Sequence, residues 1–228
     1  MKSDMLEKMF SCYLANKDLN FIGPQIIEQS VDKENKYLVK NNNEFYLKRK
    51  VITKINHLDE VLIIISSGSL INLEVFKKIG LFRDGFFIDY IDFEFSLRAK
   101  FNNFKIVISK DALLYHNQGA QSIHNMGLLT INCHNYNASR RYTISRNRIF
   151  YLRLFALKLP LICFYEIGAI LFDVFRILFF ENNKVNKIFQ IFTGIFHGIT
   201  KRIPKYLDFK KIYLVDKGCE FEFFFEKT

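Results

Sequence analysis

The sequence has few cysteines, and their arrangement does not suit a metal site or a disulfide framework. Four cysteines occur in 228 residues, far apart, without a Cys-x-x-Cys pair or a histidine at ligand spacing. The pattern is typical of free thiols in a reducing compartment. The four are Cys12, Cys133, Cys163 and Cys219. Tryptophan is absent, and 26 Phe with 11 Tyr make the chain unusually rich in phenylalanine.

The first ten residues lack the apolar run of a secretory signal. Charged residues interrupt them, namely Lys2, Asp4, Glu7 and Lys8. The spacing of apolar residues predicts an amphipathic helix over residues 4–15 instead. A short buried strand over 19–27, followed by a Gly-Pro turn, and an exposed, Asn-rich polar stretch over 28–50 are expected next.

Acidic residues are absent from a long block in the middle of the chain. Between Ala112 and Tyr165 there is no Asp or Glu, whereas six basic residues fall there: Arg140, Arg141, Arg146, Arg148, Arg153 and Lys158. Guanidinium groups suit such a block to a diphosphate leaving group or an anionic headgroup, and a solvated basic helix face is the alternative. The formal net charge of +10 also favours an anionic partner. No recognised nucleic-acid motif is present, so we expect no nucleic-acid partner.

Carboxylates gather instead in an aromatic segment, FFIDYIDFEFSLR at residues 86–98. Asp89, Asp92 and Glu94 fall within six residues, where acids cost free energy unless they are hydrogen-bonded, paired or used in chemistry. Asp89 is expected to cap a helix, and Asp92 then lies in its first turn, held ionised by free N–H groups as suits a general base. Glu94 and Arg98 have ion-pair spacing. An ordinary acidic helix start is the alternative.

Local signals place this segment after a helix and a small-residue loop. A helix over 72–79 ends at Gly80, and Asp84-Gly85 indicates a turn. Residues 61–65 are predicted to form a central strand buried on both faces. That strand would deliver Ser66-Ser67-Gly68-Ser69 to the sheet edge, where a sugar could approach closely, although a plain Gly/Ser turn has the same sequence.

Two apolar helices follow the basic block. Residues 159–180 are almost wholly apolar, but Glu166, Asp173 and Arg176, with Lys158, share an arc of about 80° on a helical wheel. This favours a helix in the membrane interface or packed into a hydrophobic partner over a span, with a buried soluble helix as the alternative. A second amphipathic helix over 185–199 precedes basic residues that favour an anionic cytoplasmic leaflet. Those residues are Lys201, Arg202 and Lys205.

The order of these motifs resembles bacterial family-2 glycosyltransferases of the GT-A fold. The matching residues are Ser66–Ser69, the IGLF ending of the next helix, the 86–98 segment, Tyr115-His116 with Gly119, and the R-R-Y-x-x-x-R-N motif from Arg140. The resemblance is to the C-terminal half of the rhamnosyltransferase group, over about residues 4–204. It implies an α/β fold: a partial GT-A, Rossmann-like mixed sheet over 1–130, a basic and amphipathic helical region over 131–206, and a divergent tail over 207–228.

The resemblance also implies roles for individual residues. Asp92 matches the catalytic base. His116 matches a histidine that helps bind the metal and the donor diphosphate. Other residues match the acceptor site (Ser67, Gly68, Ser69, Asp89 and Glu94) and the diphosphate-binding arginines (Arg141 and Arg146). A divalent metal, Mg²⁺ or Mn²⁺, is implied, but the nucleotide-binding half and its Asp-x-Asp motif would precede Met1. We therefore expect a fragment of a longer reading frame or a separate N-terminal half.

The implied activity is an inverting hexosyl transfer from dTDP-L-rhamnose or a UDP-sugar. The implied acceptor is a lipid-linked saccharide or a growing polysaccharide, in lipopolysaccharide or other surface-glycan synthesis. The protein would sit peripherally on the cytoplasmic face of the inner membrane. The alternative is a non-catalytic membrane-associated or partner-binding module derived from such an enzyme.

Overall fold

The computed structural model describes residues 4–16, 18–28, 36–40, 47–51, 60–116, 122–126, 129–207, 213–217 and 220–224. The helices are α1 Met5–Ala15, α2 Leu73–Ile79, the short 3-10 helix η2 Asp84–Phe86, α3 Ile91–Lys100, α4 Ala138–Phe155, α5 Leu161–Phe180 and α6 Lys184–Thr200. The strands are β1 Phe21–Glu28, β2 Lys36–Lys40, β3 Leu47–Val51, β4 Leu70–Ile71, β5 Ile106–His116, β6 Ser122–Met126, β7 Leu129–Cys133, β8 Tyr213–Lys217 and β9 Glu220–Phe224.

A small mixed sheet with the order β4-β1-β5 lies at the centre of the N-terminal part. Strand β1 runs parallel to β5 and antiparallel to β4. Because neighbouring side chains alternate between faces, Phe21 packs with α2 and α3, whereas Ile22 packs against α1. The predicted α/β class and mixed sheet are confirmed, as are the helix start near residue 4 and the end of α2 at Gly80, whose φ is 76°.

The Gly-Pro pair does not form the predicted turn. Gly23 and Pro24 lie inside β1, which continues to Glu28. The register against β5 shifts after Pro24, from a Pro24–Ser109 pair to a Gln25–Leu113 pair. Proline cannot donate to a strand ladder, and an irregularity at this point lets the strand continue past it.

The predicted central strand over 61–65 is also wrong. Val61, Leu62 and Ile64 are buried. The start of the segment is joined to β5 by an isolated bridge between Glu60 and Val107 and by a hydrogen bond from the Val61 N–H to the Ile106 carbonyl at 3.0 Å, but residues 62–65 do not form a strand. The hydroxyl of Ser96, on α3, accepts a hydrogen bond from the Ile64 N–H at 3.3 Å and donates one to the Ile64 carbonyl at 3.2 Å. The Ser96 side chain therefore satisfies the backbone N–H and carbonyl of Ile64, which a neighbouring strand would otherwise pair with.

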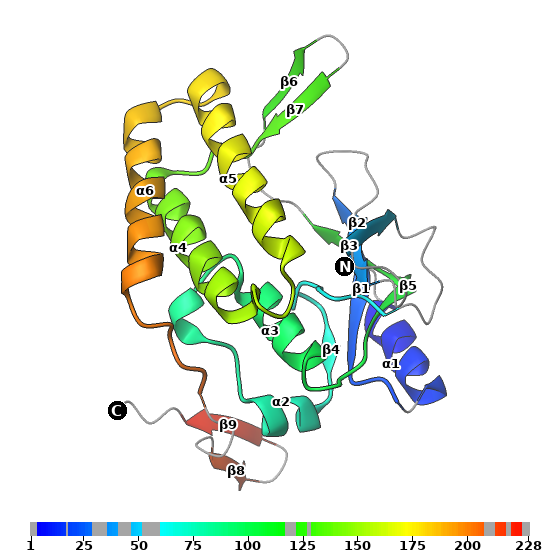
Figure 1. Ribbon diagram of the computed structural model, residues 1–228. Coiled ribbons are helices and arrows are strands. Elements are labelled where there is room, and N and C mark those ends of the chain that lie inside the picture. Colours follow the sequence, from blue (N-terminus) through cyan, green and yellow to red (C-terminus); the bar gives the residue numbers. More distant parts are fainter. Residues whose placement is uncertain are drawn as a thin grey trace.

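Helices α4, α5 and α6 form a helical layer that packs against α3, with α6 alongside α4 (Figure 1). A Cβ on Gly194 would lie 2.4 Å from the Tyr142 carbonyl oxygen, and one on Gly198 would lie 2.9 Å from the Arg146 carbonyl oxygen. These two glycines therefore allow close contact between α6 and α4. Leu97 of α3 and Tyr151 of α4 share one buried cluster, which joins this layer to the rest of the fold.

Pairs of strands form hairpins outside the sheet. The polar stretch contains β2 and β3, and the tail contains β8 and β9, each pair antiparallel. The asparagines at 41–43 lie outside the described residues. Cys12, Cys133 and Cys163 are free thiols, as predicted, and Cys219 also lies outside the described residues.

Candidate active site

Asp92 lies in the first turn of α3, as predicted, and faces the end of the buried 61–65 segment. The Ser66 hydroxyl donates a hydrogen bond to Asp92 Oδ1 at 2.5 Å. The sequence places Ser66 in the small-residue loop but predicts a site role only for the next three residues, so this contact with Asp92 was missed. The only sequence signal for it is a hydroxyl placed directly after a buried apolar run.

Burial raises the pKa of Asp92 above its ordinary value. Hydrogen bonds from Ser66 lower the pKa, and the negative charge of Asp89 raises it, but loss of hydration dominates. The helix start therefore does not hold Asp92 ionised as strongly as expected. A raised pKa makes the carboxylate a stronger base, which suits proton acceptance from a hydroxyl.

The other predicted residues of the small-residue loop form a turn. The Ser69 N–H donates to the Ser66 carbonyl at 3.0 Å, and the Ser69 hydroxyl donates to the Ile65 carbonyl at 2.7 Å. Gly68 has a φ of 69°, which favours glycine, and both Ser67 and Gly68 are exposed. Their sugar-binding role stays a prediction.

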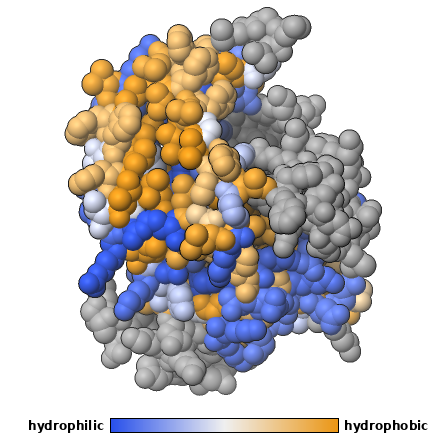
Figure 2. Space-filling model, viewed as in Figure 1, coloured by the Kyte–Doolittle hydropathy of each residue, from blue (hydrophilic) through white to orange (hydrophobic). Residues whose placement is uncertain are grey.

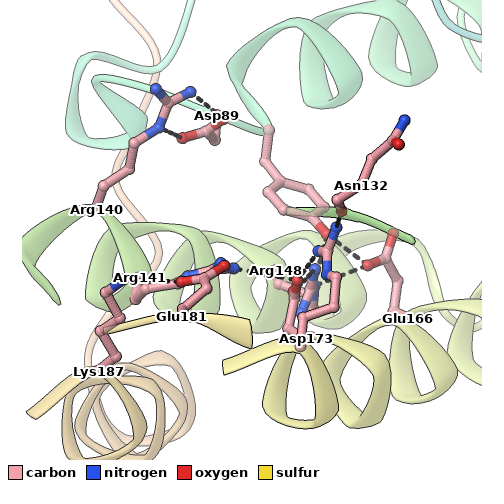
Figure 3. Close-up of polar contacts among 11 residues, drawn as sticks. Asp89, Asn132, Arg140, Arg141, Arg148, Glu166, Asp173, Glu181 and Lys187 are labelled. Atoms are coloured by element: carbon pink, nitrogen blue, oxygen red, sulfur yellow. Dashed lines mark hydrogen bonds and ion pairs between the residues drawn. The ribbon is translucent and has the colours of Figure 1, made fainter. Parts of the chain in front are cut away.

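Asp89 is not the N-cap of α3. The capping position belongs to Tyr90, without a side-chain cap. Phe87, Asp89 and Tyr90 all have positive φ, between 52° and 61°, a conformation that non-glycine residues rarely adopt. The Asp89 carboxylate instead accepts two hydrogen bonds from Arg140, at 3.0 and 3.1 Å (Figure 3). Because this bidentate ion pair with Arg140 of α4 holds the Asp89 carboxylate, the carboxylate does not cap α3.

Asn147 of α4 holds this loop from the other side. Its side-chain nitrogen donates to the carbonyl oxygens of Phe86, Ile88 and Asp89, at 2.7, 2.9 and 3.1 Å. The neighbouring Arg146 donates to the Gly85 carbonyl at 2.7 Å. Asn147 is fully buried. The RN pair of the R-R-Y-x-x-x-R-N motif therefore fixes the backbone that leads to Asp92, and a diphosphate contact by Arg146 stays a prediction.

Glu94 points into a cluster of arginines. Arg98 donates to both of its carboxylate oxygens, at 2.9 and 3.0 Å, which confirms the predicted ion pair. Arg83 adds a third contact at 2.8 Å. Glu94 is 1% exposed, so its contacts are those of a residue that positions α3. An acceptor contact by Glu94 stays a prediction.

Arg141 lies inside the helical layer. Its guanidinium pairs with Asp173 at 3.1 Å and Glu181 at 2.6 Å, and Lys187 also binds Glu181 (Figure 3). Arg141 is 2% exposed, which leaves no surface for the diphosphate contact predicted from the sequence. Asp173 and Glu181, which follow the acid-free block in the sequence, thus neutralise Arg141 of that block. Neither a solvated basic helix face nor a site for an anionic ligand predicts this pairing.

A second set of buried charges connects Tyr90 to α5. The Tyr90 hydroxyl donates to Glu166 at 2.5 Å and accepts from Arg148 at 2.6 Å. Arg148 also pairs with Asp173 at 3.1 Å. Burial raises the pKa of Glu166; it would also raise the pKa of Asp173, but the surrounding arginines, Arg148 first, lower it. These contacts tie the loop before Asp92 to two helices.

The described residues do not assemble a metal site. No group of three His, Cys, Asp or Glu side chains among them could hold a metal ion. His116 ends β5, where it pairs with Glu28 in the strand register, and its side chain lies outside the described part. The described side chains therefore do not form a metal centre of their own, and metal or diphosphate binding by His116 stays a prediction.

Comparison with known proteins supports a glycosyltransferase family. The chain is 30% identical over 154 residues to a dTDP-rhamnosyl transferase, RfbF, from Shigella flexneri. The aligned part covers 67% of this chain and 50% of the relative, so the chain spans about half the length of that protein. No family model matches the sequence. No solved structure matches it either.

Proposed function

We propose that this chain supplies the acceptor side of an inverting glycosyltransferase site, with Asp92 as the general base. The observation that carries the proposal is the Asp92 carboxylate at the start of α3, hydrogen-bonded to Ser66 and with a pKa raised by burial. The similarity to a rhamnosyltransferase supports sugar transfer as the reaction class. It also favours dTDP-rhamnose as the donor, with a UDP-sugar as the other candidate.

In the proposed reaction, Asp92 accepts the proton of an acceptor hydroxyl as that oxygen attacks the anomeric carbon of the donor. The bond from the anomeric carbon to the diphosphate oxygen breaks, and its electron pair leaves with the nucleoside diphosphate. Attack from the opposite side inverts the anomeric centre. The acceptor is a lipid-linked saccharide or a growing surface polysaccharide. Ser67, Gly68 and Ser69 would border it.

The supporting residues hold Asp92 rather than react. Asn147, Arg140 and Arg148 fix the loop that ends at Tyr90, and Glu94 anchors the following turn of α3. Preorganisation of this kind contributes to catalysis because a misplaced base loses much of its effect.

The test begins with calorimetric titration of the chain with dTDP and UDP, with and without Mn²⁺. Transfer from dTDP-rhamnose and from UDP-sugars to saccharide acceptors is then measured for the chain, Asp92→Asn and the control Asp111→Asn. Asp111 is an exposed acid on β5. Asp92→Asn should lower transfer by about 100-fold or more, whereas the control should retain it. Full transfer by Asp92→Asn would overturn the base assignment.

A non-catalytic module derived from such an enzyme is the second candidate. The large exposed apolar surface of the helical layer favours it. Absence of nucleotide binding and of transfer, together with retained binding to lipid vesicles, would support this candidate over the enzyme.

A further inference from the structure

The helical layer exposes no carboxylate. Residues 138–207, all of which the structure describes, contain three acids: Glu166, Asp173 and Glu181. They are 3%, 6% and 1% exposed. Each lies against basic side chains of the same layer, among them Arg141 and Arg148. The surface of the layer therefore carries no negative side chain, although the sequence of the layer contains three acids.

Basic side chains remain on that surface. They stand before α5, at the start of α6 and after its end: Lys158, Lys184, Lys201, Arg202 and Lys205 are all exposed. With the three acids buried, nothing in this layer offsets their charge locally. An anionic surface is the electrostatic complement of this arrangement.

Large apolar side chains cover the outward face of α5 and α6. On α5, Phe164 is 75% exposed and Leu171 67%; on α6, Phe189 is 63% and Phe192 61%. The charged residues of α5 face inward, so its outward side is uncharged. Figure 2 shows hydrophobic residues gathered in a large patch over the α5 and α6 region, with hydrophilic residues at its border. A large exposed apolar patch with a polar border is typical of an interaction site.

We propose that this α5–α6 face docks onto a lipid bilayer whose headgroups are anionic. The phenylalanines would enter the boundary between headgroups and acyl chains, and the flanking lysines and Arg202 would contact lipid phosphates. No helix in the described part of the chain is long and apolar enough to cross a membrane. A second copy of the chain is a poorer partner, because two faces without acids would bring like charges together.

The test is co-flotation of the purified chain with vesicles of phosphatidylcholine alone and of phosphatidylcholine with phosphatidylglycerol. Phe189→Ser/Phe192→Ser removes two exposed rings of the face. The matched control, Phe10→Ser/Leu14→Ser, removes two apolar side chains of α1 that are 53% and 59% exposed. The face variant should lose at least about tenfold in partitioning, and the control should bind like the unchanged chain. Thermal unfolding followed by circular dichroism confirms that each variant is folded.

A charge-reversal pair tests the electrostatic part. Lys201→Glu/Arg202→Glu should lower binding to phosphatidylglycerol vesicles by about tenfold, and Lys77→Glu/Lys78→Glu on α2 should not. No flotation of the unchanged chain, or equal losses in the face and control variants, would overturn the proposal. So would a dimer in sedimentation velocity that only the face variant dissociates. The assay needs neither nucleotide nor sugar, so its failure leaves the proposed transfer reaction untouched.

Discussion

Arg141 Nη2 lies 2.6 Å from Glu181 Oε1, in a pair whose side chains are 2% and 0% exposed. The two residues are 40 positions apart. Asp173 and Lys187 extend the pair into a chain of alternating charge through α4, α5 and α6. These ion pairs explain how the basic helix α4 and the apolar helix α5, whose acids face inward, pack into one layer.

Replacement of Arg141 by Met should destabilise the protein by about 3–5 kcal/mol, because it removes the buried cation between Asp173 and Glu181. The two acids then keep only the basic partners on their other sides, Arg148 and Arg176 for Asp173 and Lys187 for Glu181. Urea unfolding followed by circular dichroism measures the change. Arg140→Met is the control, since the side chains of the Arg140–Asp89 pair are 33% and 24% exposed and its loss should cost less than about 1 kcal/mol. Equal losses in the two variants would contradict a structural role for the buried pair.

Asn147→Ala should lower the free energy of unfolding by at least about 2 kcal/mol, because it removes the hydrogen bonds that the buried amide donates to three carbonyl groups of the 86–89 loop. Asn186, exposed on α6, provides the control Asn186→Ala, which should be nearly neutral. Amide hydrogen exchange gives the local measure: exchange in residues 86–92 should speed up in Asn147→Ala beyond the change in α1. A uniform change over both segments would argue against a specific hold on the loop.

The local sequence predicted correctly those elements whose structure depends on residues within the element itself. The α2 helix follows from its Asn72 cap and the glycine that ends it. The position of Glu166, Asp173 and Arg176 on one side of α5 follows from their helical spacing, although the spacing does not say that this side faces inward. In each case the deciding residues lie within one element, where periodicity and capping act.

The errors arose where a distant residue decides the outcome. A buried β-branched run such as 61–65 fits a strand or an extended segment equally, and Ser96, 32 residues away from Ile64, decides between them. Asp89 has the sequence of a cap, but Arg140, 51 residues away, takes its carboxylate. Competition of this kind depends on tertiary contacts that no local pattern contains.

Gly194→Ala should destabilise the protein by about 1–3 kcal/mol, because its Cβ would press on the Tyr142 carbonyl and separate α6 from α4. Gly168 of α5 is a matched control, since a Cβ there meets nothing within 4 Å. Gly168→Ala should be neutral or stabilising by up to about 1 kcal/mol. Thermal unfolding of the two variants compares them directly. A loss in Gly168→Ala as large as that in Gly194→Ala would show that close helix contact is not the cause.

Asp92→Asn should be more stable than the unchanged chain at neutral pH, because burial raises the pKa of Asp92 in the folded state. The folded protein binds this proton more tightly than the unfolded chain, whose pKa is about 3.9. Stability is therefore lost as the pH rises from the unfolded value through the folded one, and the asparagine variant escapes that loss. The advantage of Asp92→Asn should grow over this window, level off above it and vanish below it.

Urea unfolding of both proteins across a pH series measures this difference, with Asp111→Asn as the control for an exposed acid. A stability advantage together with lost sugar transfer would identify Asp92 as a residue kept for chemistry at the expense of stability. If Asp92→Asn instead becomes less stable relative to the unchanged chain as the pH rises, the ionised carboxylate stabilises the fold. Its hydrogen bond with Ser66 would then be structural, and the case for a general base at this position would fall.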